Sequence, residues 1–83
     1  KFTVSLGSFS TYSRAQMQAD RHRARAQSAN LANPRIVKVN VGGKQLYGVR
    51  VGRFQDRAAA DKARQQLGAE AKIATTDGEQ PGI

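Results

Sequence analysis

The sequence predicts an α+β fold of order βαββαβ, in which a four-stranded antiparallel sheet carries two helices on one face. One observation is an eight-residue phrase that occurs twice, as FTVSLGSF over 2–9 and as YGVRVGRF over 47–54. A polar, alanine-rich stretch of helical character follows each copy, and a Gly-Gly turn joins the second copy to the β-branched segment before it. A repeated strand-turn-helix unit joined by a hairpin generates this layered fold.

The first copy of the phrase predicts a strand followed by a helix. Apolar and polar residues alternate over 2–6, a period of two that indicates a half-buried strand, and we expect Gly7 to end it. Ser13 stands three residues before Gln16, which is the capping-box spacing of a helix start. Pro34 disfavours helix just before it and marks a boundary. One face of the helix is marked at steps of four and three by Ala15, Ala19, His22, Ala26 and Ala29.

The segments 36–41 and 46–51 predict a hairpin, because a tight turn at Gly42-Gly43 separates two runs rich in β-branched residues. In the second run we expect one face to turn toward the core, namely Tyr47, Val49 and Val51. In the first run we expect the core face to be Val37, Val39 and Val41, and the opposite face to be Ile36, Lys38 and Asn40.

The second copy of the phrase predicts the other helix and a last strand. Asp56 is suited to cap a helix over 57–67, and Gly68 is suited to end it. The helix turns Ala60, Ala63 and Leu67 inward. A short strand over 71–76 follows. We therefore expect a domain over 1–76 and a loose C-terminal tail over 77–83, where turn-forming residues show no pattern.

Because both helices cover one sheet face, we expect the other face to be open. Its side chains would be polar and basic with two aliphatic ones, namely Thr3, Ser5, Ile36, Lys38, Asn40, Leu46, Gly48 and Arg50. An open sheet face of this composition favours a binding platform over a catalytic cleft.

Composition narrows the class of partner. The net charge of +8 is uneven, since residues 1–50 hold nine Lys/Arg and one acid, whereas residues 51–83 hold five of each. Such a field suits a polyanionic neighbour, such as nucleic acid, an anionic membrane or an acidic wall polymer, although solubility alone also explains it. The chain has no cysteine, which excludes disulfides and thiol chemistry. It has no initiator Met and no signal peptide, so we expect a fragment of a longer protein, with any targeting segment outside it.

Catalytic chemistry is not indicated. The single histidine, His22, lies on the alanine face of the first helix, where packing is its expected role. No cluster in the sequence has metal-ligand spacing, and Asp56 and Asp61 suit cap and surface roles. The arginines of the first helix are interpreted as a solvated face. The motif Gly42-Gly43-Lys44 lacks the spacing of a phosphate loop and joins two strands.

The two phrases, each followed by an alanine-patterned helix, resemble the half-repeats of a SPOR (sporulation-related repeat) domain over about Phe2 to Thr76. The stretch YGVRVGRFQDRAAADKARQQL is especially similar to that family. The resemblance implies a bacterial module that binds peptidoglycan glycan strands lacking stem peptides, in the periplasm or cell envelope at the division septum. The parent protein could then be a division protein, an amidase or a lytic transglycosylase. We expect a monomer that needs no cofactor and inserts no segment into a membrane.

The resemblance also implies that the ligand binds the open sheet face and the end of the first strand. Ser5 stands where many family members have Gln, and Ser8 keeps the serine that follows the glycine. We expect a lactyl carboxylate of the glycan to meet Arg50 or Lys38 through charge-assisted hydrogen bonds. The full set of expected glycan-binding residues is Thr3, Ser5, Ser8, Lys38, Asn40, Leu46 and Arg50.

Two other interpretations stay open at the level of sequence. RNA-binding modules of the ribonucleoprotein (RNP) type share the βαββαβ order, and a basic chain favours RNA. Such modules stack bases on aromatic residues of their central strands, whereas the third predicted strand presents a glycine and an arginine on its open face. We therefore do not expect a nucleic-acid partner. The other interpretation is a subdomain of an enzyme, which the missing acid–base constellation disfavours.

Overall fold

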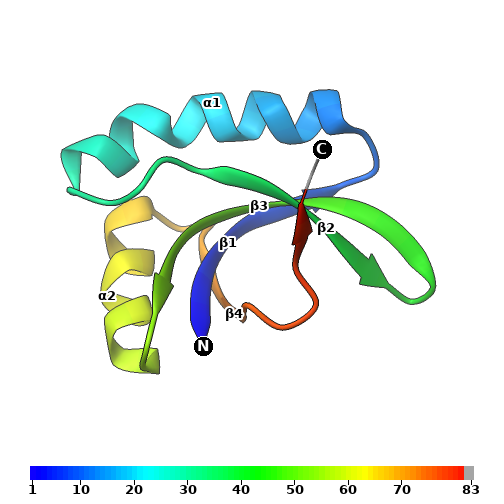
Figure 1. Ribbon diagram of the computed structural model, residues 1–83. Helices are drawn as coiled ribbons and strands as arrows, with labels where there is room; N and C mark the ends of the chain where they lie inside the picture. The colour runs from blue at the N-terminus through cyan, green and yellow to red at the C-terminus, as the bar shows by residue number, and fades with distance from the viewer. Residues whose placement is uncertain (82–83) are drawn as a thin grey trace.

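The computed structural model describes residues 1–81 and confirms the predicted α+β fold with its βαββαβ order. Figure 1 shows α1 lying along one side of the sheet, α2 at one end of the same side, and the last connection passing on the opposite side. The elements are β1 (Phe2–Phe9), α1 (Tyr12–Ser28), β2 (Arg35–Val41), β3 (Lys44–Phe54), α2 (Arg57–Leu67), β4 (Lys72–Thr75) and β5 (Gln80–Pro81). Neither helix in this part of the chain is long and apolar enough to cross a membrane.

The sheet is antiparallel throughout, with strand order β4-β1-β3-β2-β5. The four predicted strands form its body. The short strand β5 adds a fifth member at the outer edge of β2, where Val37 pairs with Pro81 and Lys38 with Gln80. The two copies of the repeated phrase, β1 and β3, are the central neighbours.

Each Gly-x-Phe motif forms a bulge rather than a strand end. The β1–β3 register slips once between Ser5 and Ser8 and once between Phe2 and Val4, which places one extra residue on each strand. Gly7 and Gly52 lie in these irregular stretches with φ of 116° and 74°. At Gly52 an added Cβ would lie 2.6 Å from Phe54 Cζ, so the phenyl ring folds back over the glycine. Gly7 therefore continues its strand instead of ending it.

The core lies between the helices and one sheet face. The buried members of this cluster include Val4, Leu6, Ala15, Ala19, Val49, Val51, Ala63 and Leu67. The predicted inward residues of α2 are all buried, as are the alanines of α1 at positions 15, 19 and 26. The small alanine side chains on both helices let the helix axes approach the sheet closely. Tyr12 of α1 and Tyr47 of β3 pack edge to face, with ring centroids 5.7 Å apart.

The helix caps agree with the sequence at α2 and differ at α1. The Asp56 carboxylate accepts a hydrogen bond from the Ala59 N–H at 2.8 Å, and Gly68 is the C-cap. In α1 the cap is Thr11, whose hydroxyl accepts from the Arg14 N–H at 3.3 Å. Ser13 lies inside the first turn, so the prediction that it caps the helix was wrong.

The face assignment of β2 was also wrong. The two-residue turn pairs Val41 with Lys44, and the register then pairs Val39 with Leu46 and Val37 with Gly48. Directly paired residues share a face, so the valines lie on the open side with the even-numbered residues of β3. Lys38 instead pairs with Tyr47, on the side of α1.

The segment after β4 differs from the expected loose tail. Residues 76–81 cross the open face of the sheet from the β4 edge to the β2 edge (Figure 1). We call this segment the strap. The Glu79 carboxylate packs against arginines of the sheet and its side chain is 7% exposed, which accounts for the order of a segment without hydrophobic pattern. The remaining expectation for the tail, over 82–83, lies outside the described residues.

Candidate functional site

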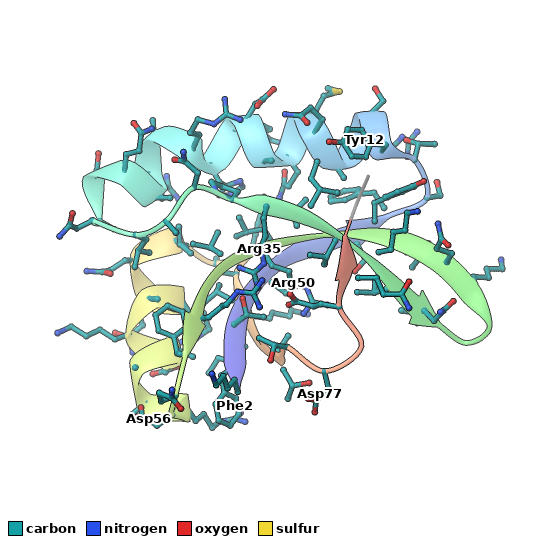
Figure 2. All side chains as sticks on the ribbon, viewed as in Figure 1. Phe2, Tyr12, Arg35, Arg50, Asp56 and Asp77 are labelled. Carbon is teal, nitrogen blue, oxygen red and sulfur yellow. The ribbon has the colours of Figure 1, made fainter. Side chains whose placement is uncertain are left out.

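A basic row crosses the open face of the sheet. Ser5 pairs with Arg50 on one side and with Lys72 on the other, and Arg50 pairs with Arg35. Because paired residues share a face, Lys72, Ser5, Arg50 and Arg35 stand side by side across four strands. Figure 2 shows the Arg35 and Arg50 side chains close together beneath the middle of the sheet. The row gives the open face three cationic groups, two of them on the neighbouring strands β3 and β2.

An apolar strip lies next to the basic row. It consists of Val37, Val39 and Val41 of β2 with Leu46 of β3, all on the open face by register. Val37 and Val39 are buried, whereas Val41 is 56% exposed at the hairpin end. The strip does not belong to the core cluster beneath the helices. The open face therefore combines an apolar surface with a row of cations.

A groove of about 350 Å³ follows this strip on one side of the strap. Its wall on β2 includes Val39, Asn40 and Val41, and Ser8 and Arg50 line it from the two central strands. The facing wall is formed by β4 and by the strap, through Ala74, Thr75, Asp77 and Gly78. We call this groove the Ser8 groove. Figure 2 shows Asp77, one of its lining residues, on the far side of the sheet from α1.

Arg50 lines the Ser8 groove and is only 9% exposed. Its NH1 group donates to the Thr75 carbonyl at 3.2 Å and lies 3.6 Å from the Glu79 carboxylate. Its Nε is buried without a hydrogen-bond partner among the described residues. Burial is the main cause that lowers the pKa of Arg50 from its ordinary value, opposed by Glu79, yet a guanidinium stays charged. The side chain thus holds a charge with an unused donor.

Gly48 makes this position of Arg50 possible. A Cβ at residue 48 would lie 3.3 Å from Arg50 Nε, so the guanidinium rests directly on the glycine backbone. The same residue pairs with Ser8 on β1 and with Val37 on β2. The absence of a side chain at Gly48 therefore leaves room for the Arg50 guanidinium between the basic row and the apolar strip.

A second cationic cluster lies on the other side of the strap. Arg35 NH2 donates to both Glu79 carboxylate oxygens at 3.0 and 3.1 Å, and Arg53 NH1 lies 4.0 Å from the same group. Arg35 NH1 also donates to the Gly52 carbonyl at 2.9 Å, while its Nε is buried without a partner within residues 1–81. A groove of about 330 Å³ opens here, lined by Arg35, Val37, Arg53, Thr76, Glu79 and Gln80. We call it the Arg53 groove.

The structure brings some of the predicted residues together and separates others. Ser8, Asn40 and Arg50 all line the Ser8 groove. Leu46 lies beside it on the apolar strip, paired with Val39. Ser5 lies opposite Arg50, and its hydroxyl accepts a hydrogen bond from the Gly7 N–H at 3.3 Å.

Three predicted residues are placed differently. Thr3 is fully buried, because its hydroxyl bonds to the Val51 and Gly52 carbonyls and accepts from Arg35 NH2. Lys38 and Asn40 pair with Tyr47 and Gln45, so by register both lie on the side of α1 rather than on the open face, although Asn40 borders the Ser8 groove. The sequence analysis did not identify the valines of β2, Arg35 or Glu79 as part of this face. The two-residue turn at 42–43 sets the register of β2 against β3, and that register already places the valines on the open face.

His22 has a packing role, as predicted from its position. It is 8% exposed, its Nδ1 lies 3.1 Å from the Gln18 carbonyl, and its Nε2 lies 3.8 Å from Glu70. Gln18 donates to the Glu70 carboxylate at 3.0 Å, and this bond is the main cause that lowers the pKa of Glu70. Nowhere in residues 1–81 do three His, Cys, Asp or Glu side chains gather as metal ligands.

One comparison with known proteins identifies a family. The family model described as SPOR domain matches residues 1–75, which is most of the chain. The comparisons with curated proteins and with solved structures gave no match.

Proposed function

We propose, from the premise that this chain belongs to the SPOR domain family, that its open face binds peptidoglycan glycan strands whose stem peptides have been removed. SPOR domains are peptidoglycan-binding modules that target bacterial proteins to the division septum. The specificity for denuded strands, the residues that bind them and the enrichment of this chain at the septum are the proposed parts.

The single observation that carries the proposal is that the Arg50 guanidinium lines the Ser8 groove beside an apolar strip. A glycan of N-acetylglucosamine and N-acetylmuramic acid presents apolar ring faces, hydroxyls and amides. Removing the stem peptide exposes a lactyl carboxylate on every muramic acid. In the Ser8 groove, Val39 and Val41 can cover a ring face while Ser8 exchanges hydrogen bonds with hydroxyls.

The carboxylate then fits Arg50. A guanidinium makes stronger hydrogen bonds with an ionised acceptor than with a neutral one, and the nearly buried Arg50 lines the Ser8 groove. A stem peptide would convert that carboxylate into an amide and would add bulk at the groove, which the strap at Asp77 and Gly78 narrows. Both effects favour the denuded strand over the intact one.

The RNA alternative has less support. Tyr47 lies beneath α1 against Tyr12, and within residues 1–81 the open face of β3 presents Leu46, Gly48 and Arg50 instead of an aromatic ring. Base stacking on this sheet would lack its usual platform. We therefore propose a non-catalytic binding module, whose parent protein carries any enzymatic activity.

Co-sedimentation with purified sacculi tests the proposal. Sacculi pretreated with an amidase should pull down clearly more of the domain than untreated sacculi. Equal recovery from both preparations, or better recovery from untreated sacculi, would contradict the denuded-strand specificity. A parallel titration with an RNA oligomer at rising salt addresses the alternative, since binding that is strong and falls steeply with salt would favour RNA.

A further inference from the structure

The strap meets the sheet mainly through one carboxylate. Strand β5 has only two residues, and one of them, Pro81, has no N–H to donate. The backbone bonds of the strap outside this strand are Thr76 N–H to the Lys1 carbonyl at 3.1 Å and Glu79 N–H to the Thr76 carbonyl at 3.3 Å. These are neutral hydrogen bonds, whereas Glu79 meets Arg35 through charge-assisted ones. Glu79 is therefore the strongest attachment of the strap.

Charge at this position is not balanced. Arg35, Arg50 and Arg53 all lie within 4.0 Å of the Glu79 carboxylate, so three cations share one anion. The side chains of Arg35 and Arg50 are 23% and 11% exposed, and the Nε of each is buried without a partner in the described chain. Buried guanidinium groups require an anionic partner, because leaving them unpaired is costly. The cluster is thus built for a carboxylate, whether internal or external.

The two grooves follow one another along β2. Val39 lines the Ser8 groove and Val37 lines the Arg53 groove, and these valines are successive open-face residues of one strand. Gln80 of the strap lines both grooves. A polymer that lies along the apolar strip and passes the strap would therefore reach Arg35 and Arg53.

We propose that Arg35 and Arg53 form a second carboxylate subsite on the open face, next to Arg50, and that Glu79 is its internal occupant. The inference rests on the proposed function, since it assumes that a glycan strand enters the Ser8 groove. A strand with two muramic acids carries a second carboxylate, which takes the place of Glu79 and releases the strap. A shorter strand leaves Glu79 where it is. The strap then makes binding selective for longer denuded strands.

Glu79→Gln, compared with Asp20→Asn on α1, isolates this competition. Both variants remove one negative charge, but within the described residues only Glu79 makes ion pairs with Arg35, Arg50 and Arg53. Calorimetric titration with a tetrasaccharide of two GlcNAc–MurNAc units should show that Glu79→Gln binds at least about fivefold more tightly than Asp20→Asn. With the disaccharide, whose single carboxylate is held at Arg50, the difference between the two variants should be clearly smaller. Equal or weaker binding of the tetrasaccharide by Glu79→Gln would overturn the proposal.

Wild-type measurements separate this proposal from the one on which it rests. Chitotetraose has a similar backbone without carboxylates, and equal wild-type affinity for both tetrasaccharides would contradict carboxylate recognition altogether. If the wild type prefers the muramic acid strand but the two variants bind it equally, the displacement of Glu79 is contradicted and carboxylate recognition by the open face still holds. If Glu79→Gln does not fold, hydrogen exchange on the wild type decides: tetrasaccharide should speed exchange of the Glu79 amide, and unchanged or slower exchange contradicts the displacement.

Discussion

Ser5 and Arg50 lie directly opposite each other on the two central strands. They are also equivalent positions of the repeated phrase, because Arg50 follows Ser5 by the repeat length of 45 residues. The pairs at the two ends show the same symmetry. Phe2 pairs with Phe54, and the residues equivalent to them in the repeat, Tyr47 and Phe9, pair with each other. The pseudo-two-fold axis of the sheet therefore passes through the Ser5–Arg50 pair. The core repeats about this axis, whereas the open face carries a hydroxyl on one side of it and a guanidinium on the other.

This asymmetry predicts that Arg50 carries much of the glycan affinity. Arg50→Gln should weaken binding of amidase-treated glycan by about tenfold or more, because hydrogen bonds to charged groups are the strong ones. Arg14→Gln, an exposed charge on α1, removes the same net charge and should change binding little. Fluorescence titration of both variants measures the difference, and equal losses in the two would reduce the role of Arg50 to long-range attraction.

The apolar strip should contribute through contact with a sugar face. Val41→Ser should weaken glycan binding by roughly fivefold, since about 1 kcal/mol of apolar burial is lost. The thermal stability of the Val41→Ser variant should stay close to that of the wild type, because Val41 is 56% exposed. Met17→Ser is the matched control, as Met17 is 63% exposed on α1. If both variants bind like the wild type, the strip does not touch the ligand.

The repeated glycines should be needed for the bulge geometry. Gly52→Ala places a Cβ at a φ of 74° and within 2.6 Å of the Phe54 ring. Gly42→Ala is also at positive φ, 57°, but meets open space, so it should cost about 1–2 kcal/mol of unfolding free energy. Gly52→Ala should cost roughly 1–3 kcal/mol more, from overpacking. Urea unfolding of both variants checks this, and equal costs would show that Phe54 does not cover the glycine.

Stability at acid pH should depend on Glu70. Its folded-state pKa lies below the ordinary value of 4.5, chiefly because Gln18 donates a hydrogen bond to the carboxylate. A lowered folded pKa gives stability that is present above the unfolded pKa and is lost as pH falls through the folded pKa. The melting temperature should therefore fall less steeply below about pH 4.5 in Glu70→Gln than in the wild type. Identical pH profiles would leave Glu70 without this role.

Local patterns predicted the helical layer well. The Asp56 cap, the bounds of α2 and its three inward residues follow from spacing within a dozen residues, and the structure has them as predicted. The β2 face was misassigned because three alternating valines were interpreted as a core face. The register from the two-residue turn, which pairs Val41 with Lys44, carried the correct answer. Apolar residues on an open face are thus a sign of a binding surface that alternation alone does not reveal.

The strap could not be predicted in the same way. Glu79 is held by Arg35, Arg50 and Arg53, which lie 44, 29 and 26 residues earlier in the chain. Nothing in the local sequence of 77–81 indicates regular structure. The contacts depend on the tertiary placement of the basic row, and that row exists only after the sheet has formed.

Backbone amide shifts of the ¹⁵N-labelled domain, titrated with amidase-treated glycan, test the central claim most directly. The account predicts that the largest changes cluster on the open face, at Ser8, Val39, Gly48 and Arg50, with little change along the outer face of α1. Changes that cluster instead on α1 and α2, with Ser8 and Gly48 unaffected, would contradict the assignment of the open face as the glycan site.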